Sequence, residues 1–467
     1  MHSIKELINF SKKEDFWYSW GDVYMQGCIG FTNGFAHSQK SFPVHIKLYI
    51  FSIENDHGYE AIPLDDAQRV ANYYFNCWKK GKVISKIEES WRREDLKLSK
   101  ILSQLDTIKL KKLESEELYN LYRTIQEIHE KFWENIMVSE AVAAFEENLL
   151  PQLIKKKFGI SQKDFLDLGA NFYVGESIVQ KYQRSLSELK QSKNSEKIDR
   201  LLNDHIKNFY WIRSGFHGYE ELTPEIVNNE IRDIKDENTP RAKEIKKNIP
   251  REAKDWLEFL SLMAYWKDEK KRVGMQTNYW IFKICEEVAE RKNIDPRIVF
   301  NTTDNELKEL ILHDKKISAK FIKREISFVD ENGRVTFYNG KNHKLIFDSY
   351  FNPQTDKMDS VRGIVASKGS HTRISGSARI IYNPIHASMN RRDILIAPST
   401  RPEYVYLMKK AKAVITDQGG LTCHAAIVSR ELGIPCIIGT RFATTAFKNG
   451  DKIEMDMNSG LIKILEK

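Results

Sequence analysis

The sequence of 467 residues has no uninterrupted apolar run of the ~18 residues that a membrane-spanning helix needs. Its first residues, MHSIKELINFSKKEDFW, also lack the long apolar core of a secretory signal. Cysteine is scarce, and the five cysteines lie far apart, at positions 28, 77, 285, 423 and 436. Their odd number argues against a disulfide framework. These absences predict a reduced, cytoplasmic protein without a membrane segment.

Signatures of phosphate loops, nucleic-acid binding and metal binding are also missing. No GxxxxGK[ST] loop occurs anywhere in the sequence. Basic residues are not interleaved with aromatic ones as in a nucleic-acid-binding segment, so we expect no nucleic-acid partner. No group of potential ligands has the spacing of a metal site, and the sequence therefore predicts none.

The net charge of +8 is concentrated in one part of the chain. Residues 361–467 hold 16 of the 73 basic and 8 of the 65 acidic residues, which leaves 57 of each in residues 1–360. A domain that docks onto a nucleotide or a phosphorylated substrate benefits from this sign. A solvated basic face explains the excess equally well, so both interpretations stay open.

Residues 1–60 and 61–325 differ in their apolar pattern. The first segment is rich in aromatics, which we expect in the core, and PVHIKLYIFSI at 43–53 alternates as a β-strand does. Residues 61–325 have helical spacing almost throughout, and helix starts are marked at Ser115, at Thr223-Pro224-Glu225 and by the capping box Thr303-Asp304-Asn305-Glu306. The sequence predicts an all-α domain of several antiparallel helices, two of them long.

Residues 326–360 are predicted to form a β-hairpin followed by a linker. Asn332-Gly333 lies between two alternating runs in ISFVDENGRVTFYNG, which is a strong hairpin signal. The next stretch, GKNHKLIFDSYFNPQTDKMDS, contains turn formers and charges with little periodicity. We expect it to be the segment on which the C-terminal domain moves.

Residues 361–467 have the pattern of a compact α/β domain. The predicted strands are ARIIY (378–382), ILIAP (394–398), AVITD (413–417), PCIIG (435–439), KIEMD (452–456) and LIKIL (461–465). Two helices are predicted between them, PEYVYLMKKA (402–411) and HAAIVSREL (424–432).

The stretch TDQGGLTCHAAIVSRELGIPCIIGT, residues 416–440, contains the candidate site. Gly419 and Gly420 allow a tight turn into a helix whose first turn carries His424, and Gly433 with Pro435 ends that helix. A glycine-rich approach to a helix N-terminus binds anions. This arrangement would hold a phosphate next to His424 or on it.

These residues resemble the phosphohistidine (swivelling) domain of the phosphoenolpyruvate-utilising enzymes, a family that includes phosphoenolpyruvate synthase, pyruvate phosphate dikinase and rifampicin phosphotransferase. The resemblance extends over residues 361–467, from GIVASKG to NGDKIEMDMNSGLIKIL. It departs at Lys368, where a proline is usual, and at Tyr406, where a proline is frequent. It implies a multidomain α + α/β protein, with a large, mostly α-helical N-terminal region followed by a swivelling β/β/α phosphohistidine domain.

The resemblance implies that His424 carries a phosphoryl group. Backbone N–H groups of Gly419 and Gly420 would hold the phosphate, and Thr422 would either bind it or cap the helix. Cys423 adjoins the histidine in sequence, and we expect a packing or polar-lining role for it. Thr400 belongs to the family's loop beside the histidine, where its expected role is to shape that loop.

The family members that charge the histidine from ATP have an ATP-grasp domain, and residues 1–360 do not resemble one. We therefore expect a phosphotransferase component of the phosphoenolpyruvate synthase or rifampicin phosphotransferase type. It would move a phosphoryl group from an ATP or phosphoenolpyruvate site on a separate ATP-grasp partner to a small-molecule acceptor bound by the helical domain. ATP and Mg²⁺ would then bind through the partner.

Two alternatives remain open at this point. The first is a non-catalytic binding or regulatory protein that uses the histidine domain as a docking module, which the lack of a nucleotide motif suggests. The second is a complete dikinase with an unrecognised nucleotide site in residues 1–360.

Overall fold

The chain passes between two structural units several times in the computed structural model. The N-terminal unit comprises Met1–Phe145, Ser214–Tyr219 and Glu269–Asn352, and the C-terminal unit comprises Glu146–Arg213, Glu220–Asp268 and Pro353–Lys467. The structure describes all residues except 1, 55–56, 106–107, 162–163, 166–167, 169–175, 193, 234–248, 314, 323–324, 352–358, 370–371, 386, 421–422 and 467.

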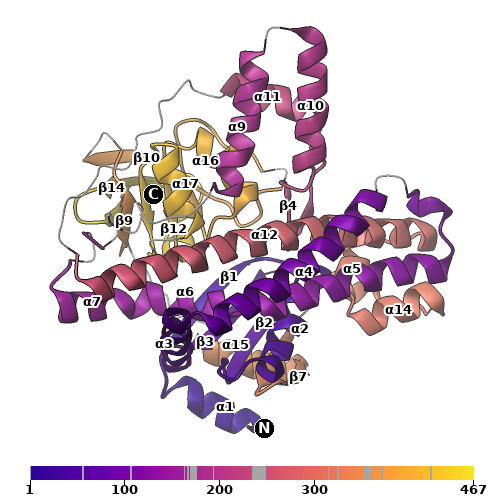
Figure 1. Ribbon diagram of the computed structural model, residues 1–467, viewed down its shortest axis with the longest axis horizontal. Helices are drawn as coiled ribbons and strands as arrows, with labels where there is room; N and C mark the ends of the chain where they lie inside the picture. Colours follow the sequence, from indigo (N-terminus) through magenta and orange to yellow (C-terminus); the bar gives the residue numbers. More distant parts are fainter. Residues whose placement is uncertain are drawn as a thin grey trace. The chain divides into compact units, whose positions relative to one another are not determined.

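The N-terminal unit combines one sheet with most of the long helices (Figure 1). Its strands are β1 (Phe16–Asp22), β2 (Leu48–Glu54), β3 (His57–Pro63), β6 (Ile326–Glu331) and β7 (Arg334–Asn339), with the short pair β4 (Ser214–Gly215) and β5 (Gly218–Tyr219). Its helices are α1 (Ile4–Ser11), α2 (Met25–Ser41), α3 (Leu64–Lys80), α4 (Lys82–Leu105), η1 (Leu110–Lys112), α5 (Ser115–Ile136), α13 (Pro296–Phe300), α14 (Asp304–Leu312), η2 (Ala319–Ile322) and α15 (Gly340–Tyr350). Two more helices continue into the other unit: α6 (Val138–Asn148) and α12 (Arg251–Lys292).

The five-stranded sheet of this unit is antiparallel throughout, in the order β1-β3-β2-β6-β7. Helices α1 and α15 cover one of its faces, where Leu7, Ile346 and Phe347 pack on Ile50 and Val329. The predicted hairpin is confirmed: β6 and β7 join at Asn332 and Gly333, both with positive φ. The predicted strand at 43–53 begins only at Leu48.

Helices dominate residues 61–325, as the sequence predicts. Three of the described helices are long, where two were predicted: α12 has 42 residues, α4 has 24 and α5 has 22. The capping box at Thr303 is confirmed, because its hydroxyl accepts from the Glu306 N–H and the Glu306 carboxylate accepts from the Thr303 N–H. Within the described residues, none of the helices is both long and apolar enough to cross a membrane.

The prediction of a linker over residues 340–360 is wrong in its first half, because Gly340–Tyr350 forms α15. Four buried residues lie at helical spacing there, namely His343, Ile346, Phe347 and Tyr350. The periodicity is hidden in the sequence because its first member is a histidine, which a hydrophobicity pattern counts as polar. Residues 352–358 of the predicted linker lie outside the described residues.

The C-terminal unit combines a helical part with a large sheet. The helices of the first part are α7 (Leu150–Phe158), α9 (Ile178–Gln191), α10 (Ser195–Phe209) and α11 (Pro224–Asp233). The second part contains β8 (Ser360–Arg362), β9 (Ile364–Ser367), β10 (Arg373–Ile380), β11 (Asp393–Ala397), η3 (Pro402–Tyr404), α16 (Val405–Lys410), β12 (Ala413–Thr416), α17 (His424–Glu431), β13 (Cys436–Ile438), α18 (Ala443–Ala446), β14 (Lys452–Asp456) and β15 (Leu461–Glu466).

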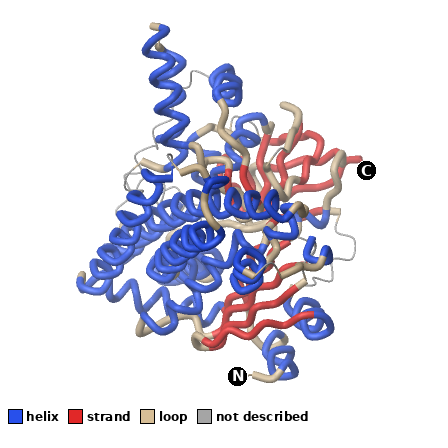
Figure 2. Tube along the Cα trace, turned by 90° about the vertical axis from the view of Figure 1, so that its right-hand side faces the viewer, coloured by secondary structure: helices blue, strands red, loops and turns tan. Residues whose placement is uncertain are grey.

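The eight strands of this sheet follow the order β8-β15-β14-β10-β11-β12-β13-β9, and Figure 2 draws them in red beside the C-terminus. The four central strands β10 to β13 are parallel, and the outer pairs are antiparallel. Side chains alternate between two cores. On β11, Leu395 packs toward α16 and α17, while Ile394 and Ile396 pack on the other face with Ile453 of β14. The predicted fold class, a mostly helical region followed by this mixed β region, is confirmed.

Candidate functional site

Three loops meet at one edge of the large sheet because β11, β12 and β13 are parallel. The carboxyl ends of parallel strands share an edge, and ligands of open α/β sheets bind there. The loop after β11 carries Thr400, the loop after β12 leads to His424, and the loop after β13 carries Thr440. Backbone hydrogen bonds join the loops: Gln418 N–H donates to the Pro398 carbonyl, and Thr440 N–H donates to the Thr416 carbonyl.

His424 is the first residue of α17, and its side chain is held by the loop after β11. Its Nδ1 lies 2.9 Å from Thr400 Oγ1, and both residues are buried. The start of α17 places the positive end of the helix dipole beside the imidazole. The Nδ1 ring nitrogen is thus engaged by the Thr400 hydroxyl.

The glycines before His424 fit the predicted tight approach. Gly419 has φ +122°, and a Cβ there would lie 2.6 Å from Cys423 Sγ, so only glycine suits this position. A Cβ on Gly420 would lie 2.6 Å from the Glu147 side chain. Cys423 holds the N-cap position of α17, where its sulfur accepts from the Ala426 N–H at 3.4 Å. Thr422, predicted to bind phosphate or cap the helix, lies outside the described residues.

Asp417 fastens this loop to the next one, a role that the sequence analysis missed. Its buried carboxylate accepts from Thr440 Oγ1 at 3.0 Å and from the Thr444 N–H at 3.2 Å, and Thr444 Oγ1 also donates to it. Burial raises the pKa of Asp417 to about 6, against the opposing effect of these donors. The only feature of the sequence that indicates this role is the position of the aspartate directly after a buried strand.

The two departures from the family pattern have structural roles of their own. The Tyr406 hydroxyl donates to the carbonyl oxygens of Pro384 and Ala387, and the Arg213 guanidinium lies 4.1 Å from the centroid of the Tyr406 ring. Lys368 Nζ donates to Asn458 Oδ1 at 2.7 Å on the surface. Neither residue belongs to the loop that leads to His424.

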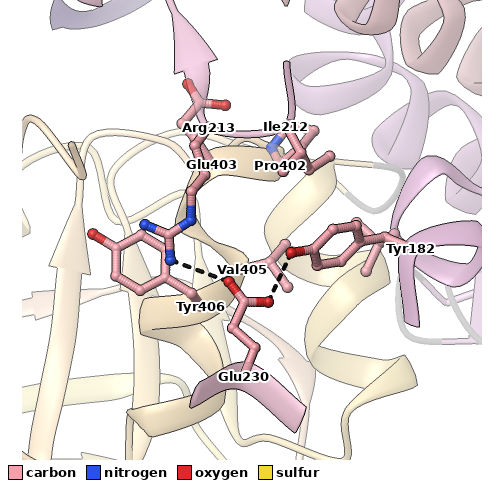
Figure 3. Close-up of a pocket in the computed structure, with 9 residues that line it drawn as sticks. Tyr182, Ile212, Arg213, Glu230, Pro402, Glu403, Val405 and Tyr406 are labelled. Carbon is pink, nitrogen blue, oxygen red and sulfur yellow. Dashed lines mark hydrogen bonds and ion pairs between the residues drawn. The ribbon is translucent and has the colours of Figure 1, made fainter. Parts of the chain in front are cut away.

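A small pocket lies beside the segment that follows Thr400, and it encloses about 310 Å³ with open solvent included. It is lined by Val179, Tyr182, Ile212, Arg213, Glu230, Pro402, Glu403, Val405 and Tyr406. In Figure 3, Arg213 and Tyr182 both reach Glu230, at 3.1 and 2.8 Å. The polar groups of Tyr182, Arg213 and Glu230 thus contact one another in this pocket.

Glu431, at the end of α17, has a strongly perturbed carboxyl group. Burial raises its pKa to about 7, and Asp268 adds to the rise, whereas Arg430 and a hydrogen bond from Ser177 oppose it. The unfolded value is near 4.5, so the folded state binds the extra proton between about pH 4.5 and 7. Stability contributed by this proton is present at low pH and is lost as the pH rises through 7.

We therefore expect Glu431→Gln to stabilise the protein at pH 8 by up to about 3 kcal/mol and to change little at pH 4.5. Urea unfolding at several pH values measures the difference between wild type and variant. Asp417 titrates in both proteins, so this difference isolates Glu431. The control is Glu196→Gln, which makes the same charge change on the exposed start of α10. A Glu431→Gln effect that does not depend on pH would contradict the prediction.

The part of the chain that contains this site is similar to known proteins. The model of the PEP-utilising enzyme mobile domain matches residues 389–460. The probable phosphoenolpyruvate synthase of Archaeoglobus fulgidus is 31% identical over 165 residues, 34% of this chain and 22% of that protein. The uncharacterized phosphotransferase YvkC of Bacillus subtilis is 32% identical over 198 residues, 40% of this chain and 24% of that protein. The phosphoenolpyruvate synthase of Pyrococcus furiosus is 53% identical over 103 residues, 22% of this chain and 12% of that protein.

The chain thus spans about a quarter or less of the length of these relatives. The YvkC alignment covers 40% of the chain, more than residues 361–467 make up, so it also includes part of residues 1–360. Aconitase X of Thermococcus kodakaraensis covers 23% of this chain and 98% of its own at 19% identity, but its TM-score of 0.19 is too low to support a conclusion.

The matched residues 389–460 include Thr400, the loop through Gly419 and Gly420, and His424. The relatives with longer alignments are a probable phosphoenolpyruvate synthase and a phosphotransferase. The C-terminal part of this chain is therefore a phosphotransferase-like mobile domain of the phosphoenolpyruvate-utilising enzymes.

Proposed function

We propose that this protein is a phosphotransferase component that carries a phosphoryl group on Nε2 of His424. The observation that supports this most is the hydrogen bond between Thr400 Oγ1 and His424 Nδ1 at the start of α17, inside the part matched by the mobile domain. When Nδ1–H donates to the Thr400 hydroxyl, Nε2 presents its lone pair as a nucleophile.

The transfer consists of two in-line displacements at phosphorus. In the first, Nε2 bonds to the phosphorus of the donor while the bond from phosphorus to the donor's bridging oxygen breaks, and the leaving oxygen keeps the electron pair. In the second, an acceptor oxygen attacks the phosphorus, the bond to Nε2 breaks with its electron pair returning to the imidazole, and the proton of a water or alcohol acceptor leaves to solvent. The backbone of the Gly419–Gly420 approach and the α17 N-terminus supply N–H groups for the phosphoryl oxygens.

The donor is proposed to be ATP held by a separate ATP-grasp partner, with which Mg²⁺ would enter, or phosphoenolpyruvate held by a phosphoenolpyruvate-using partner. The sequence contains no GxxxxGK[ST] loop, which motivates a nucleotide site on another chain. The positive charge of residues 361–467 favours an encounter with a phosphate-rich donor site. The acceptor is proposed to be a small molecule with an oxygen nucleophile: pyruvate, water or a small alcohol.

Labelling in a lysate of the native host tests the proposal. The purified chain is incubated with lysate and radiolabelled ATP or phosphoenolpyruvate, and acid-labile, alkali-stable label is then measured on the protein. The more effective donor indicates whether to seek an ATP-grasp partner or a phosphoenolpyruvate-using one. Absence of label from both donors, in a lysate with demonstrably active kinases, would favour the docking-module alternative.

Thr400→Val is expected to slow phosphorylation of His424 by roughly 10- to 100-fold. Valine keeps the shape of threonine but removes the hydroxyl, and a hydrogen bond to a group that gains charge contributes about 1.5–3 kcal/mol. The initial rate of label uptake measures the effect, and Thr400→Ser, which restores the hydroxyl, should recover most of the rate. Equal rates for Thr400→Val and wild type would show that this hydrogen bond does not orient the imidazole.

A further inference from the structure

Two glutamates and a histidine meet in the N-terminal unit, whereas the candidate site belongs to the C-terminal unit. Glu54 ends β2, Glu325 immediately precedes β6, and His343 lies in the first turn of α15. One ligand atom from each side chain lies within 4.8 Å of the other two. The spacing of these three residues in the sequence does not indicate a metal site, because they come from distant parts of the chain.

The sheet face beneath α15 changes from apolar to polar at this place. Along β2 and β6, every second residue points toward α15, and the apolar part of this face is formed by Leu48, Ile50 and Val329. The same alternation continues into Ser52 and Glu54 on β2 and into Ser327 and Glu325 on β6. Helix α15 therefore packs on apolar side chains at one end and on serine hydroxyls and glutamate carboxylates at the other.

The two glutamates follow directly on the last pair of the ladder between β2 and β6. These strands are antiparallel and their pairing ends with Ile53 and Ile326, so Glu54 and Glu325 are the next residues on the two segments. Like charges directly across a strand pair are destabilising unless a cation lies near them. Lys344 Nζ is 3.7 Å from Glu54 Oε1, but the lysine side chain is 56% exposed and also pairs with Asp348.

His343 is oriented as a metal ligand is. The residue is fully buried, and its Nδ1 lies 2.8 Å from Ser327 Oγ, which in turn lies 2.7 Å from Ser52 Oγ. Histidine ligands of metals typically donate their second ring N–H to a fixed acceptor of this kind. The imidazole can take either of two tautomers here. When Nε2–H donates to Glu54 Oε2, 2.7 Å away, Nδ1 accepts from the Ser327 hydroxyl; when Nδ1–H donates to Ser327, the Nε2 lone pair faces Glu54 Oε2 and is placed to bind a cation between them.

We propose that Glu54, Glu325 and His343 bind a divalent first-row metal cation, with Zn²⁺ as the preferred ion. One imidazole nitrogen and two carboxylates form a donor set that suits this class, and water completes a tetrahedral site. Bonds of about 2.0–2.1 Å place the ligand atoms of such a site roughly 3.3 Å apart. His343 Nε2 and Glu54 Oε2 are 2.7 Å apart, the three ligand atoms all lie within 4.8 Å of one another, and the exposed Glu325 side chain is able to turn inward.

The cation would link α15 to two strands at once. Helix α15 is the last element of the N-terminal unit before the chain enters the C-terminal unit at residue 353. A metal bond from His343 to Glu54 and Glu325 would fix the first turn of this helix on the sheet. The inference does not depend on the chemistry of His424.

The test is a titration of the full-length protein, purified without a histidine tag and stripped with a chelator, with ZnCl₂ in competition with a chromogenic zinc indicator. Wild type is expected to bind one equivalent of Zn²⁺, with a rise of its unfolding temperature. Glu325→Gln should weaken binding at least tenfold, and His343→Gln should abolish it. Glu325 is exposed, so its variant stays informative if the change at the buried His343 impairs folding.

The same sheet offers a matched control. His2 Nδ1 lies 2.5 Å from Glu331 Oε1, which makes a second histidine–glutamate pair, and no third potential ligand is grouped with it among the described residues. His2→Gln should therefore bind Zn²⁺ as wild type does. The proposal is overturned if wild type binds no Zn²⁺, or if Glu325→Gln binds it as tightly as wild type. Equal weakening by His2→Gln and Glu325→Gln would overturn it as well.

Discussion

The His424→Ala protein is expected to take up no acid-labile, alkali-stable phosphoryl group under conditions that label wild type. The reason is chemical: the proposed transfer forms a bond between phosphorus and Nε2, and alanine offers no nucleophile in its place. The N–H groups at the start of α17 can still bind phosphate after this change, but they cannot form the covalent intermediate. The measurement is label on the protein after denaturation, which removes bound but unreacted donor.

A second buried histidine in the same unit provides the control for this variant. His205 is fully buried on α10, and its Nδ1 lies 2.8 Å from Ser185 Oγ, so its surroundings resemble those of His424. His205→Ala removes an imidazole of similar burial, and it should keep the label in the fraction that remains folded. Full labelling of His424→Ala would place the phosphoryl group on another residue and would contradict the proposed role of His424.

Gly419→Ala is expected to lower the rate of His424 phosphorylation by about 100-fold or more. Its φ of +122° is unfavourable for alanine, and the added Cβ would lie 2.6 Å from the sulfur of Cys423, the N-cap of α17. To relieve this overlap, the start of α17 must move, and the imidazole of His424 moves with it. A shift of about 1 Å in a reacting group costs on the order of 100-fold in rate.

Gly450→Ala is the control for Gly419→Ala. It introduces backbone strain at a positive φ without displacing the residues around His424. Gly450 has φ +96°, but a Cβ there meets no atom within 4 Å, and the residue lies just before β14. It should lose stability through its backbone and keep its phosphorylation rate. Initial rates of label uptake and unfolding midpoints for the two variants measure both effects. Equal rates for Gly419→Ala and wild type would mean that the loop geometry does not position His424.

Much of the C-terminal fold can be predicted from sequence because each local signal is strong there. The strands around Ile394 to Ala397 and Ala413 to Thr416 are short apolar runs bounded by turn residues, and α17 has a marked start and end. Gly419 marks the tight turn before His424 directly. Among the described residues of that loop it alone has a positive φ, a conformation that glycine adopts readily.

Contacts between segments that are distant in the sequence could not be predicted from such local signals. The hydrogen bond from Thr400 to His424 joins two loops that only the parallel order of β11 and β12 brings together. Asp417 likewise looks like an ordinary residue after a strand until Thr440 and Thr444 fold around its carboxylate. Helix α15 was missed for a related reason, since His343 becomes an inward-facing residue only when Glu54 and Ser327 supply its partners.

The most direct test of the account is to identify the nitrogen of His424 that carries the phosphoryl group. Phosphorus and nitrogen NMR of the phosphorylated protein, labelled with ¹⁵N-histidine, distinguishes a bond to Nε2 from a bond to Nδ1. Because Nδ1 is held by Thr400 Oγ1 at 2.9 Å, the account predicts phosphorus on Nε2 of His424 and on no other histidine. A phosphoryl group on Nδ1, or on a histidine other than His424, would contradict it.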